Sequence, residues 1–223
     1  MKTAHQQRLL IDGPAGKLEI VVNDPSPEID AAANRAARAP RGLALIAHPH
    51  PLFGGTLDNK VVQTLAKTFF AQGYVAARMN FRGVGATEGV HDHGTGETED
   101  WLVAVREMRT RYGPLPLLLA GFSFGAYVQS RVAERLREQD TSVARLVLVA
   151  PAVGRFQLAP VAPDTLVIHG EDDDVVPLRE VLAWARTQRL PVVVLPGAGH
   201  FFHGNLVELQ RIIHQSCPCP GMQ

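Results

Sequence analysis

The sequence predicts a single α/β domain with a mostly parallel central sheet that helices cover on both faces. Apolar runs of strand type alternate with amphipathic segments from residue 43 to residue 214, and this alternation is typical of parallel sheets. A chain of 223 residues with 46% hydrophobic and 20% charged residues is ordinary for one such domain. The connection at residues 151–164 contains three prolines and is too short for a cap domain.

The elements follow in chain order. Residues 7–22 predict two short strands around a turn at 12–16, which we expect to pair as an antiparallel hairpin. Residues 23–41 are rich in Pro, Ala and charge, so the domain 1–223 begins with a hairpin and a surface loop over residues 1–41. Later strands are expected at 43–48, 74–81, 115–121, 144–150, 165–170 and 191–197, and helices at 59–72, 98–112, 124–137, 178–188 and 205–214.

Charge and composition exclude several classes of partner. Lys plus Arg equals Asp plus Glu at 22 each, so no overall field draws the chain to nucleic acid or to an anionic membrane surface. The first residues contain only three consecutive apolar side chains, at 9–11, far fewer than a signal peptide or membrane span needs. We therefore expect a cytoplasmic protein whose partner is a small molecule, with a homodimer left open.

The cysteines lie close together at the end of the chain. Cys217 and Cys219 are separated by one proline, so they are poor partners for a structural disulfide. We expect residues 215–223 to form a flexible tail.

The strongest motif is Gly121-Phe122-Ser123-Phe124-Gly125. It follows the apolar strand at 115–121 and opens the helix at 124–137. A nucleophilic serine on a sharp strand-to-helix turn requires this context, because flanking glycines let neighbouring backbones approach while the hydroxyl stays accessible. The alternative, a glycine-rich turn whose serine only caps a helix, is less compatible with this placement.

The chain resembles the α/β-hydrolase superfamily, and more closely its small lidless bacterial branch of predicted serine hydrolases, similar in size to dienelactone hydrolase. The resemblance lies in HPHPLFGGTLDNKVV at 48–62, NFRGVGATEG at 80–89, the motif around Ser123, and GHFFH at 199–203. It implies an α/β-hydrolase fold with no cap domain and a catalytic triad in the order serine, acid, histidine. It implies no particular substrate.

The register of that superfamily selects Asp173 as the acid. Three aspartates follow the strand at 165–170, and the family places the acid third after the glycine and four before the proline. Asp172 and Asp174 are the rivals, because a slip of one residue in a turn would exchange them.

His200 is our choice for the general base. It follows the strand at 191–197 on a loop of small residues that can carry an imidazole to the serine at the carboxyl edge of the sheet. A serine hydroxyl needs such an imidazole, held in turn by a carboxylate. His203 and His214 fall near or within the last helix, where packing or solvent exposure is the simpler interpretation.

A tetrahedral intermediate also requires two backbone N–H donors. Phe124 supplies one by its position after the serine, and the loop after the strand at 43–48 supplies the other. Pro49 and Pro51 have no N–H, so His50 is the best match and Leu52 the second.

The histidines at 48, 50, 91 and 93 invite a metal interpretation, but no carboxylate stands at ligand spacing around the first pair. We therefore predict no metal and no cofactor. The Phe81-Arg82-Gly83-Val84-Gly85 turn lacks the Lys-Ser/Thr ending of a phosphate loop. We expect it to be a scaffold, with Arg82 pairing with Glu97 or Asp100.

These residues predict a serine hydrolase of the carboxylesterase type that cleaves small acyl esters through an acyl-enzyme intermediate. A thioesterase, amidase or acyltransferase can use the same triad. A binding protein on the same scaffold is the third alternative, and the complete set of Ser123, Asp173 and His200 argues against it.

Overall fold

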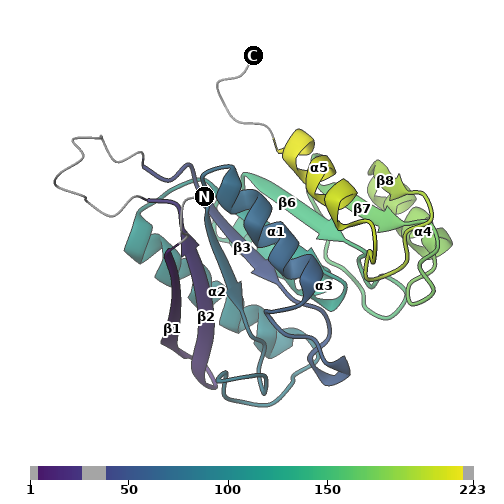
Figure 1. Ribbon diagram of the computed structural model, residues 1–223. Coiled ribbons are helices and arrows are strands. Elements are labelled where there is room, and N and C mark those ends of the chain that lie inside the picture. The colour runs from purple at the N-terminus through teal and green to yellow at the C-terminus, as the bar shows by residue number, and fades with distance from the viewer. Residues whose placement is uncertain (1–4, 27–38, 218–223) are drawn as a thin grey trace.

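One mixed sheet forms the centre of the molecule (Figure 1). The computed structural model describes residues 5–26 and 39–217, and within them eight strands lie in the order β1-β2-β4-β3-β5-β6-β7-β8. β1 pairs antiparallel with β2, β2 pairs antiparallel with β4, and the remaining neighbours are parallel. The strands are β1 (His5–Gly13), β2 (Gly16–Asp24), β3 (Leu43–Ala47), β4 (Val75–Met79), β5 (Leu117–Phe122), β6 (Arg145–Val149), β7 (Leu166–Gly170) and β8 (Val192–Leu195).

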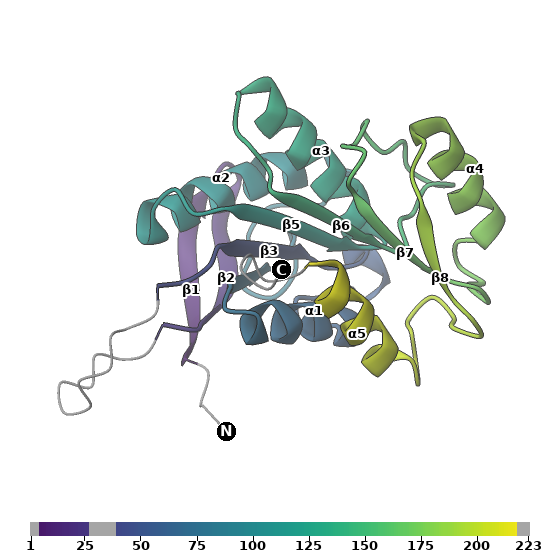
Figure 2. The same ribbon diagram turned by 90° about the horizontal axis from the view of Figure 1, so that it is seen from above.

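Helices cover both faces of the sheet. Figure 2 shows α2, α3 and α4 on one side and α1 and α5 on the other. The helices are α1 (Lys60–Ala71), α2 (Thr95–Tyr112), α3 (Phe124–Glu138), α4 (Leu178–Gln188) and α5 (Leu206–Ser216), and a short 3-10 helix, η1 (Pro51–Phe53), follows β3. The alternation of strands and helices predicted from the sequence is therefore what the described residues form.

The pattern on β3 explains why the sheet has two apolar faces. Leu43 and Leu45 contribute to the core beneath α2 and α3, whereas Ala44 and Ile46 contribute to the core beneath α1 and α5. All five residues of β3 are buried, because successive side chains of a strand point to opposite faces and both faces are covered. A continuous apolar run was thus the correct signal for a central strand.

The order of the strands indicates where the sheet can bind a ligand. The chain passes from β3 to β4 on one side and then to β5 on the other side of β3. Loops that leave the carboxyl ends of two neighbouring strands in opposite directions leave a crevice between them, where ligands bind in open α/β sheets. Here these are the segments after β3 and after β5.

One helix boundary differs from expectation in an informative way. Helix α2 begins at Thr95 rather than near residue 98, because the Glu97 carboxylate accepts hydrogen bonds from the backbone N–H groups of Asp92 (2.8 Å) and Gly94 (2.7 Å). This carboxylate stabilises the first turn of the helix. The connection between β6 and β7 contains no helix, in agreement with the expected absence of a cap domain.

The C-terminal expectation needs a correction. Helix α5 continues to Ser216, and Cys217 is buried at its end, so the first three residues of the predicted tail 215–223 belong to the fold. Burial raises the pKa of the Cys217 thiol. Residues 218–223, with Cys219, and residues 27–38 of the predicted surface loop lie outside the described residues.

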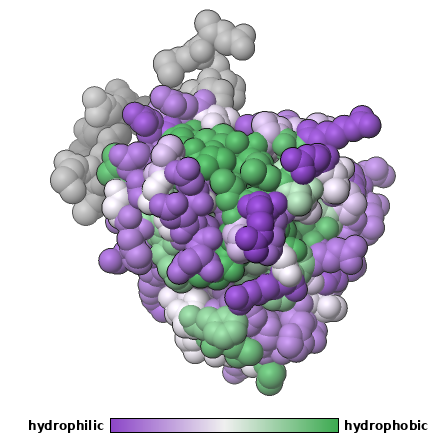
Figure 3. All heavy atoms as spheres, turned by 90° about the vertical axis from the view of Figure 1, so that its right-hand side faces the viewer, coloured by the Kyte–Doolittle hydropathy of each residue, from purple (hydrophilic) through white to green (hydrophobic). Residues whose placement is uncertain are grey.

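Two features of the surface bear on partners. No helix within residues 5–26 and 39–217 is long and apolar enough to cross a membrane. At the edge of the sheet, Val192, Val193 and Val194 of β8 are half-buried. Figure 3 views the molecule from this side and shows a broad apolar area bordered by polar side chains.

Candidate active site

Ser123 stands on a strained turn between β5 and α3. Its backbone has φ 56° and ψ −115°, a conformation that a residue with a side chain adopts at a cost. The Ser123 N–H donates to the carbonyl oxygen of Val149 on β6 at 2.9 Å, which holds the turn against the neighbouring strand. The hydroxyl makes no capping hydrogen bond to α3, so the serine does not serve as a helix cap.

The two glycines of the motif are required by close backbone approach. A Cβ on Gly121 would lie 2.2 Å from the carbonyl oxygen of Gly125, and a Cβ on Gly125 would lie 2.4 Å from the carbonyl oxygen of Ala47. Only glycine fits at either position, because real Cβ atoms do not approach backbone so closely. The start of α3 can therefore pack against the carboxyl end of β3, where the loop with His50 begins.

The three predicted catalytic side chains form one hydrogen-bonded chain. His200 Nε2 lies 3.1 Å from Ser123 Oγ, and His200 Nδ1 lies 2.7 Å from Asp173 Oδ2. Ser123 is 8% exposed, Asp173 5% and His200 4%. They come from the carboxyl ends of β5, β7 and β8, so this edge of the sheet brings together residues far apart in the sequence.

The turn after β7 distinguishes the three aspartates. Asp173 Oδ1 accepts hydrogen bonds from the N–H groups of Val176 (2.7 Å) and Val175 (3.0 Å), whereas Asp172 and Asp174 are exposed. Burial alone would raise the pKa of Asp173, but the hydrogen bonds from His200 and from Val176 outweigh it and hold that pKa below its ordinary value. Asp173 is therefore a carboxylate at neutral pH.

The rival histidines are exposed to solvent. His203 and His214 are exposed, and the His203 ring stacks on Phe201 with 5.9 Å between ring centroids. Both fit the solvent-facing interpretation.

A histidine that the sequence reasoning did not single out lies behind the acid. His169, at the end of β7, is fully buried, and its Nε2 lies 2.9 Å from the carbonyl oxygen of Val176 and 3.4 Å from Asp173 Oδ2. Burial lowers the pKa of His169, so its ring is neutral. The proton of this neutral ring is on Nε2, because the Val176 carbonyl oxygen can only accept a hydrogen bond. This N–H therefore ties the turn to the strand and faces the carboxylate.

The two predicted backbone N–H donors have no acceptor among the described residues, and the His50 ring lies 4.8 Å from the ring of Phe124, the residue after the serine. Within the described part of the chain, neither the Phe124 N–H nor the His50 N–H donates to another group. The Leu52 N–H is engaged, because it donates to His50 Nδ1 at 3.3 Å. Of the two donors considered in this loop, His50 is thus the one left free.

His48 fixes the start of the same loop. Its Nδ1–H donates to the Pro49 carbonyl at 2.6 Å, and its Nε2 accepts from the Phe81 N–H at 2.9 Å. Burial lowers the pKa of His48 to about 3. Protonation of the ring would put a second N–H on Nε2, facing the Phe81 N–H, and the two donors would repel each other. His48 is accordingly a neutral anchor between β3 and the turn after β4.

Comparison with known proteins now decides the family. A family model described as Hydrolase_4, serine aminopeptidase S33, matches residues 40–162, which include β3, the segment after it and the motif around Ser123. The chain belongs to this family. The match ends before Asp173 and His200, so the assignment of those two residues rests on the geometry given above.

Relatives of the hydrolase agree with the assignment. A solved structure from Xanthomonas campestris, described as an α/β serine hydrolase without lid, is 33% identical with a TM-score of 0.85, over 100% of this chain and 99% of that chain. An α/β serine hydrolase homologue from Coxiella burnetii is 36% identical with a TM-score of 0.79, over 98% and 100% of the two chains. A Rickettsia prowazekii protein, RP471, is 29% identical over 210 residues, 88% of this chain and 87% of that protein. The predicted α/β-hydrolase fold is confirmed.

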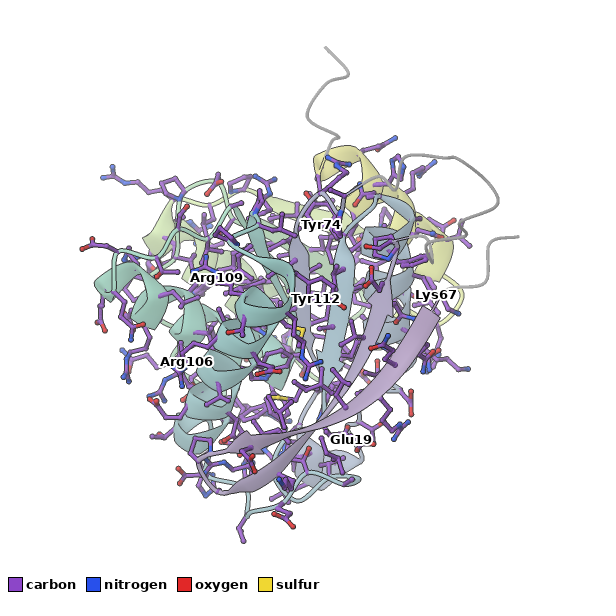
Figure 4. The ribbon with its side chains drawn as sticks, turned by 90° about the vertical axis from the view of Figure 1, so that its left-hand side faces the viewer. Glu19, Lys67, Tyr74, Arg106, Arg109 and Tyr112 are labelled. Carbon is purple, nitrogen blue, oxygen red and sulfur yellow. The ribbon has the colours of Figure 1, made fainter. Side chains whose placement is uncertain are left out.

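The turn after β4 of the hydrolase is a scaffold, as expected. Glu19 of β2, labelled in Figure 4, is buried and accepts hydrogen bonds from Asn80 Nδ2 (2.6 Å) and from the Ala86 N–H (2.8 Å). A Cβ on Gly85 would lie 2.3 Å from this carboxylate. Arg82 forms a two-pronged ion pair with Asp100 of α2, at 2.6 and 2.9 Å, which settles the predicted pairing.

The histidines near the site of the hydrolase form a ring cluster. The centroids of His50 and His91 are 4.8 Å apart, and those of His91 and His93 are 4.9 Å apart. His91 Nδ1 also lies 2.9 Å from Glu97 Oε1. Among residues 5–26 and 39–217, no group of three or more His, Cys, Asp or Glu is arranged to hold a metal ion.

Proposed function

We propose that this hydrolase cleaves esters of small acyl groups through an acyl-enzyme intermediate. The observation that carries the proposal is the hydrogen-bonded chain from Asp173 through His200 to Ser123. Hydroxyl, imidazole and carboxylate in this order are the groups that acyl transfer requires.

Each group has a role in the first half of the proposed reaction. Ser123 Oγ attacks the ester carbonyl carbon while its proton passes to His200 Nε2. Asp173 holds the other nitrogen of the ring and stabilises the imidazolium that forms. The negative charge on the former carbonyl oxygen is stabilised by the N–H groups of Phe124 and His50. When the tetrahedral intermediate collapses, the bond to the alcohol oxygen breaks and His200 donates its proton to that oxygen.

The second half repeats these steps with water. His200 accepts a proton from a water molecule as the water oxygen attacks the acyl carbon on Ser123 Oγ. Collapse of the second intermediate breaks the bond to Ser123, which regains its proton from His200, and releases the carboxylic acid. Within the described residues, the connection from β6 to β7 contains no helix that could enclose a long acyl chain, which supports a small acyl group.

A comparison of substrates on purified protein tests the proposal. We expect wild-type protein to hydrolyse p-nitrophenyl acetate faster than an acyl-CoA thioester or an acyl anilide, and Ser123→Ala to lose roughly 10⁴-fold or more of the ester activity. Ser142→Ala is the matched control, because Ser142 is an exposed serine outside the site, and it should retain full activity.

Each other outcome has a definite meaning. Preference for the thioester or the anilide would replace the ester proposal with a thioesterase or an amidase on the same triad, and transfer of the acetyl group to an added alcohol in preference to water would indicate an acyltransferase. Absence of turnover on all three substrates would favour a binding protein.

A further inference from the structure

A second histidine–carboxylate pair lies beside the residues that carry the proposed oxyanion donors. His91 Nδ1 lies 2.9 Å from Glu97 Oε1, and the two side chains are 4% and 0% exposed. Within the described part of the chain, neither ring nitrogen of His91 makes a well-aligned hydrogen bond, which is rare for a buried polar group. The rings around this imidazole, together with the close approach of Glu97, therefore hold it in place.

The His91 ring contacts both residues that supply the proposed donors. Its centroid lies 4.8 Å from that of His50 and 5.4 Å from that of Phe124, and the His50 and Phe124 centroids are 4.8 Å apart. Figure 1 shows the segments that follow β3 and β4, in blue, at the lower end of the molecule. The three rings thus form a triangle, and two of its corners belong to the residues whose N–H groups are proposed to bind the oxyanion.

The segment that carries His91 is fixed to two helices. Glu97 of α2 accepts hydrogen bonds from the N–H groups of Asp92 (2.8 Å) and Gly94 (2.7 Å). A Cβ on Gly94 would lie 2.3 Å from the ring of Tyr127 on α3, so this segment also packs closely against the helix that follows the nucleophile. His91 therefore approaches the loop after β3 from a firm support.

The backbone around His50 is stiff. Pro49 and Pro51 flank this residue, and a proline fixes its own φ and restricts the residue before it. The His50 ring is tied to the same loop, because its Nδ1 accepts a hydrogen bond from the Leu52 N–H at 3.3 Å. A displaced ring would therefore carry the His50 N–H with it. An oxyanion donor acts at about 2.7–3.1 Å, so even a small displacement matters.

We propose that His91 is a positioning residue for the oxyanion hole, and that its ring fixes the N–H groups of His50 and Phe124 relative to each other. This inference rests on the proposed function. Without the ring, the loop after β3 can move into the vacated space, and the two N–H groups no longer converge on one oxygen. The loss falls on the transition state, because the negative charge on that oxygen develops only there.

Variants at His91 separate the ring from its polar atoms. His91→Ala should lower kcat/KM for p-nitrophenyl acetate about tenfold, less than the roughly 10²–10³-fold that loss of a whole donor costs. His91→Phe keeps a ring and should retain most of the activity, whereas His91→Asn keeps polar atoms and should behave as His91→Ala does. Urea unfolding verifies that each variant is folded.

His93→Asn is the matched control on the same segment. Among the described residues, the His93 ring contacts the ring of His91 but neither of the rings of His50 and Phe124. Asparagine tolerates the left-handed backbone of this exposed residue, whose φ is 49°. His93→Asn should therefore keep the wild-type kcat/KM.

A transition-state analogue examines the oxyanion hole without turnover. Ser123 Oγ adds to the carbonyl carbon of trifluoroacetone, the serine proton passes to His200, and the carbonyl oxygen becomes an oxyanion. The dissociation constant, measured by fluorine NMR, should rise about tenfold in His91→Ala and stay near the wild-type value in His91→Phe and His93→Asn. The midpoint of the pH dependence of kcat/KM, which reports His200, should not move in His91→Ala, whereas general damage to the triad would move it.

The outcomes separate the positioning role from the esterase proposal. Wild-type activity in His91→Ala, an equal loss in His93→Asn, rescue by Asn rather than by Phe, or a shifted pH midpoint would overturn the positioning role. Ester hydrolysis with an unchanged affinity of His91→Ala for trifluoroacetone would also reject that role and keep the esterase. Ketone binding that weakens in His91→Ala, in a protein that hydrolyses no ester, would reject the esterase and keep the positioning role. Absence of ketone binding by wild-type protein would reject both.

Discussion

Acid should destabilise this hydrolase through His48. The pKa of His48 is about 3 in the folded chain, against 6.5 for an unperturbed histidine. A histidine whose pKa is depressed by folding contributes stability that is fully present above pH 6.5 and is lost as the pH falls towards 3. At pH 5 the loss covers about 1.5 pH units, and at about 1.4 kcal/mol per unit it amounts to about 2 kcal/mol of the free energy of unfolding. This is a large part of the roughly 5–15 kcal/mol typical of a domain.

Urea unfolding at pH 7 and pH 5 measures the effect. His48→Gln removes the titrating group and keeps a donor and an acceptor, so the loss of stability between the two pH values should be about 2 kcal/mol smaller than in wild type. His214→Gln is the control, because His214 is exposed and should leave the pH dependence unchanged. An equal pH dependence in wild type and His48→Gln would refute the buried neutral imidazole.

Three further predictions concern the supports of the site. Asp173→Asn should lower kcat in an esterase assay by about 10³-fold or more because the imidazole loses its orientation, while Asp174→Asn, at an exposed residue, should change kcat little. The reverse result would identify Asp174 as the catalytic acid. His169→Phe should lower kcat roughly tenfold with KM unchanged, because the Asp173 carboxylate shifts. His169→Gln keeps a hydrogen-bond donor and should retain most of the wild-type kcat. An equal loss of kcat in both variants would show that the His169 N–H does not position the carboxylate. Gly125→Ala should cost about 3 kcal/mol in chemical unfolding, because its Cβ would meet the Ala47 carbonyl; unaltered stability would contradict the close approach.

Local signals explain what the sequence could predict. Gly121 is needed for a contact between a strand and the helix that follows it, and Gly125 for a contact with Ala47 of β3. Both glycines nevertheless fall within one short motif that the sequence shows. Asp173 was selected by the register that the superfamily resemblance implies, and His200 by its place on a loop after a strand. The α/β class followed from apolar runs such as β3, whose residues are buried on both faces.

Contacts between distant segments explain what the sequence could not predict. The proximity of His169 to Asp173 depends on the path of the turn through Val176, and nothing in the composition of that turn specifies it. The early start of α2 depends on a carboxylate reaching back to a glycine rather than to the usual capping residue. The expectation of no membrane partner used the net charge and the short apolar run at residues 9–11, and it stays a prediction. The exposure of Phe53 and Val90 appears only once the loops are folded.

The central claim is that Ser123 is an activated nucleophile, and covalent labelling tests it most directly. Purified protein is incubated with an alkyl fluorophosphonate and analysed by intact mass and peptide mapping. The account predicts one adduct per chain, on Ser123, formed much more slowly in His200→Gln and absent in Ser123→Ala. An unlabelled wild-type protein, or equal labelling of wild type and Ser123→Ala, would contradict it.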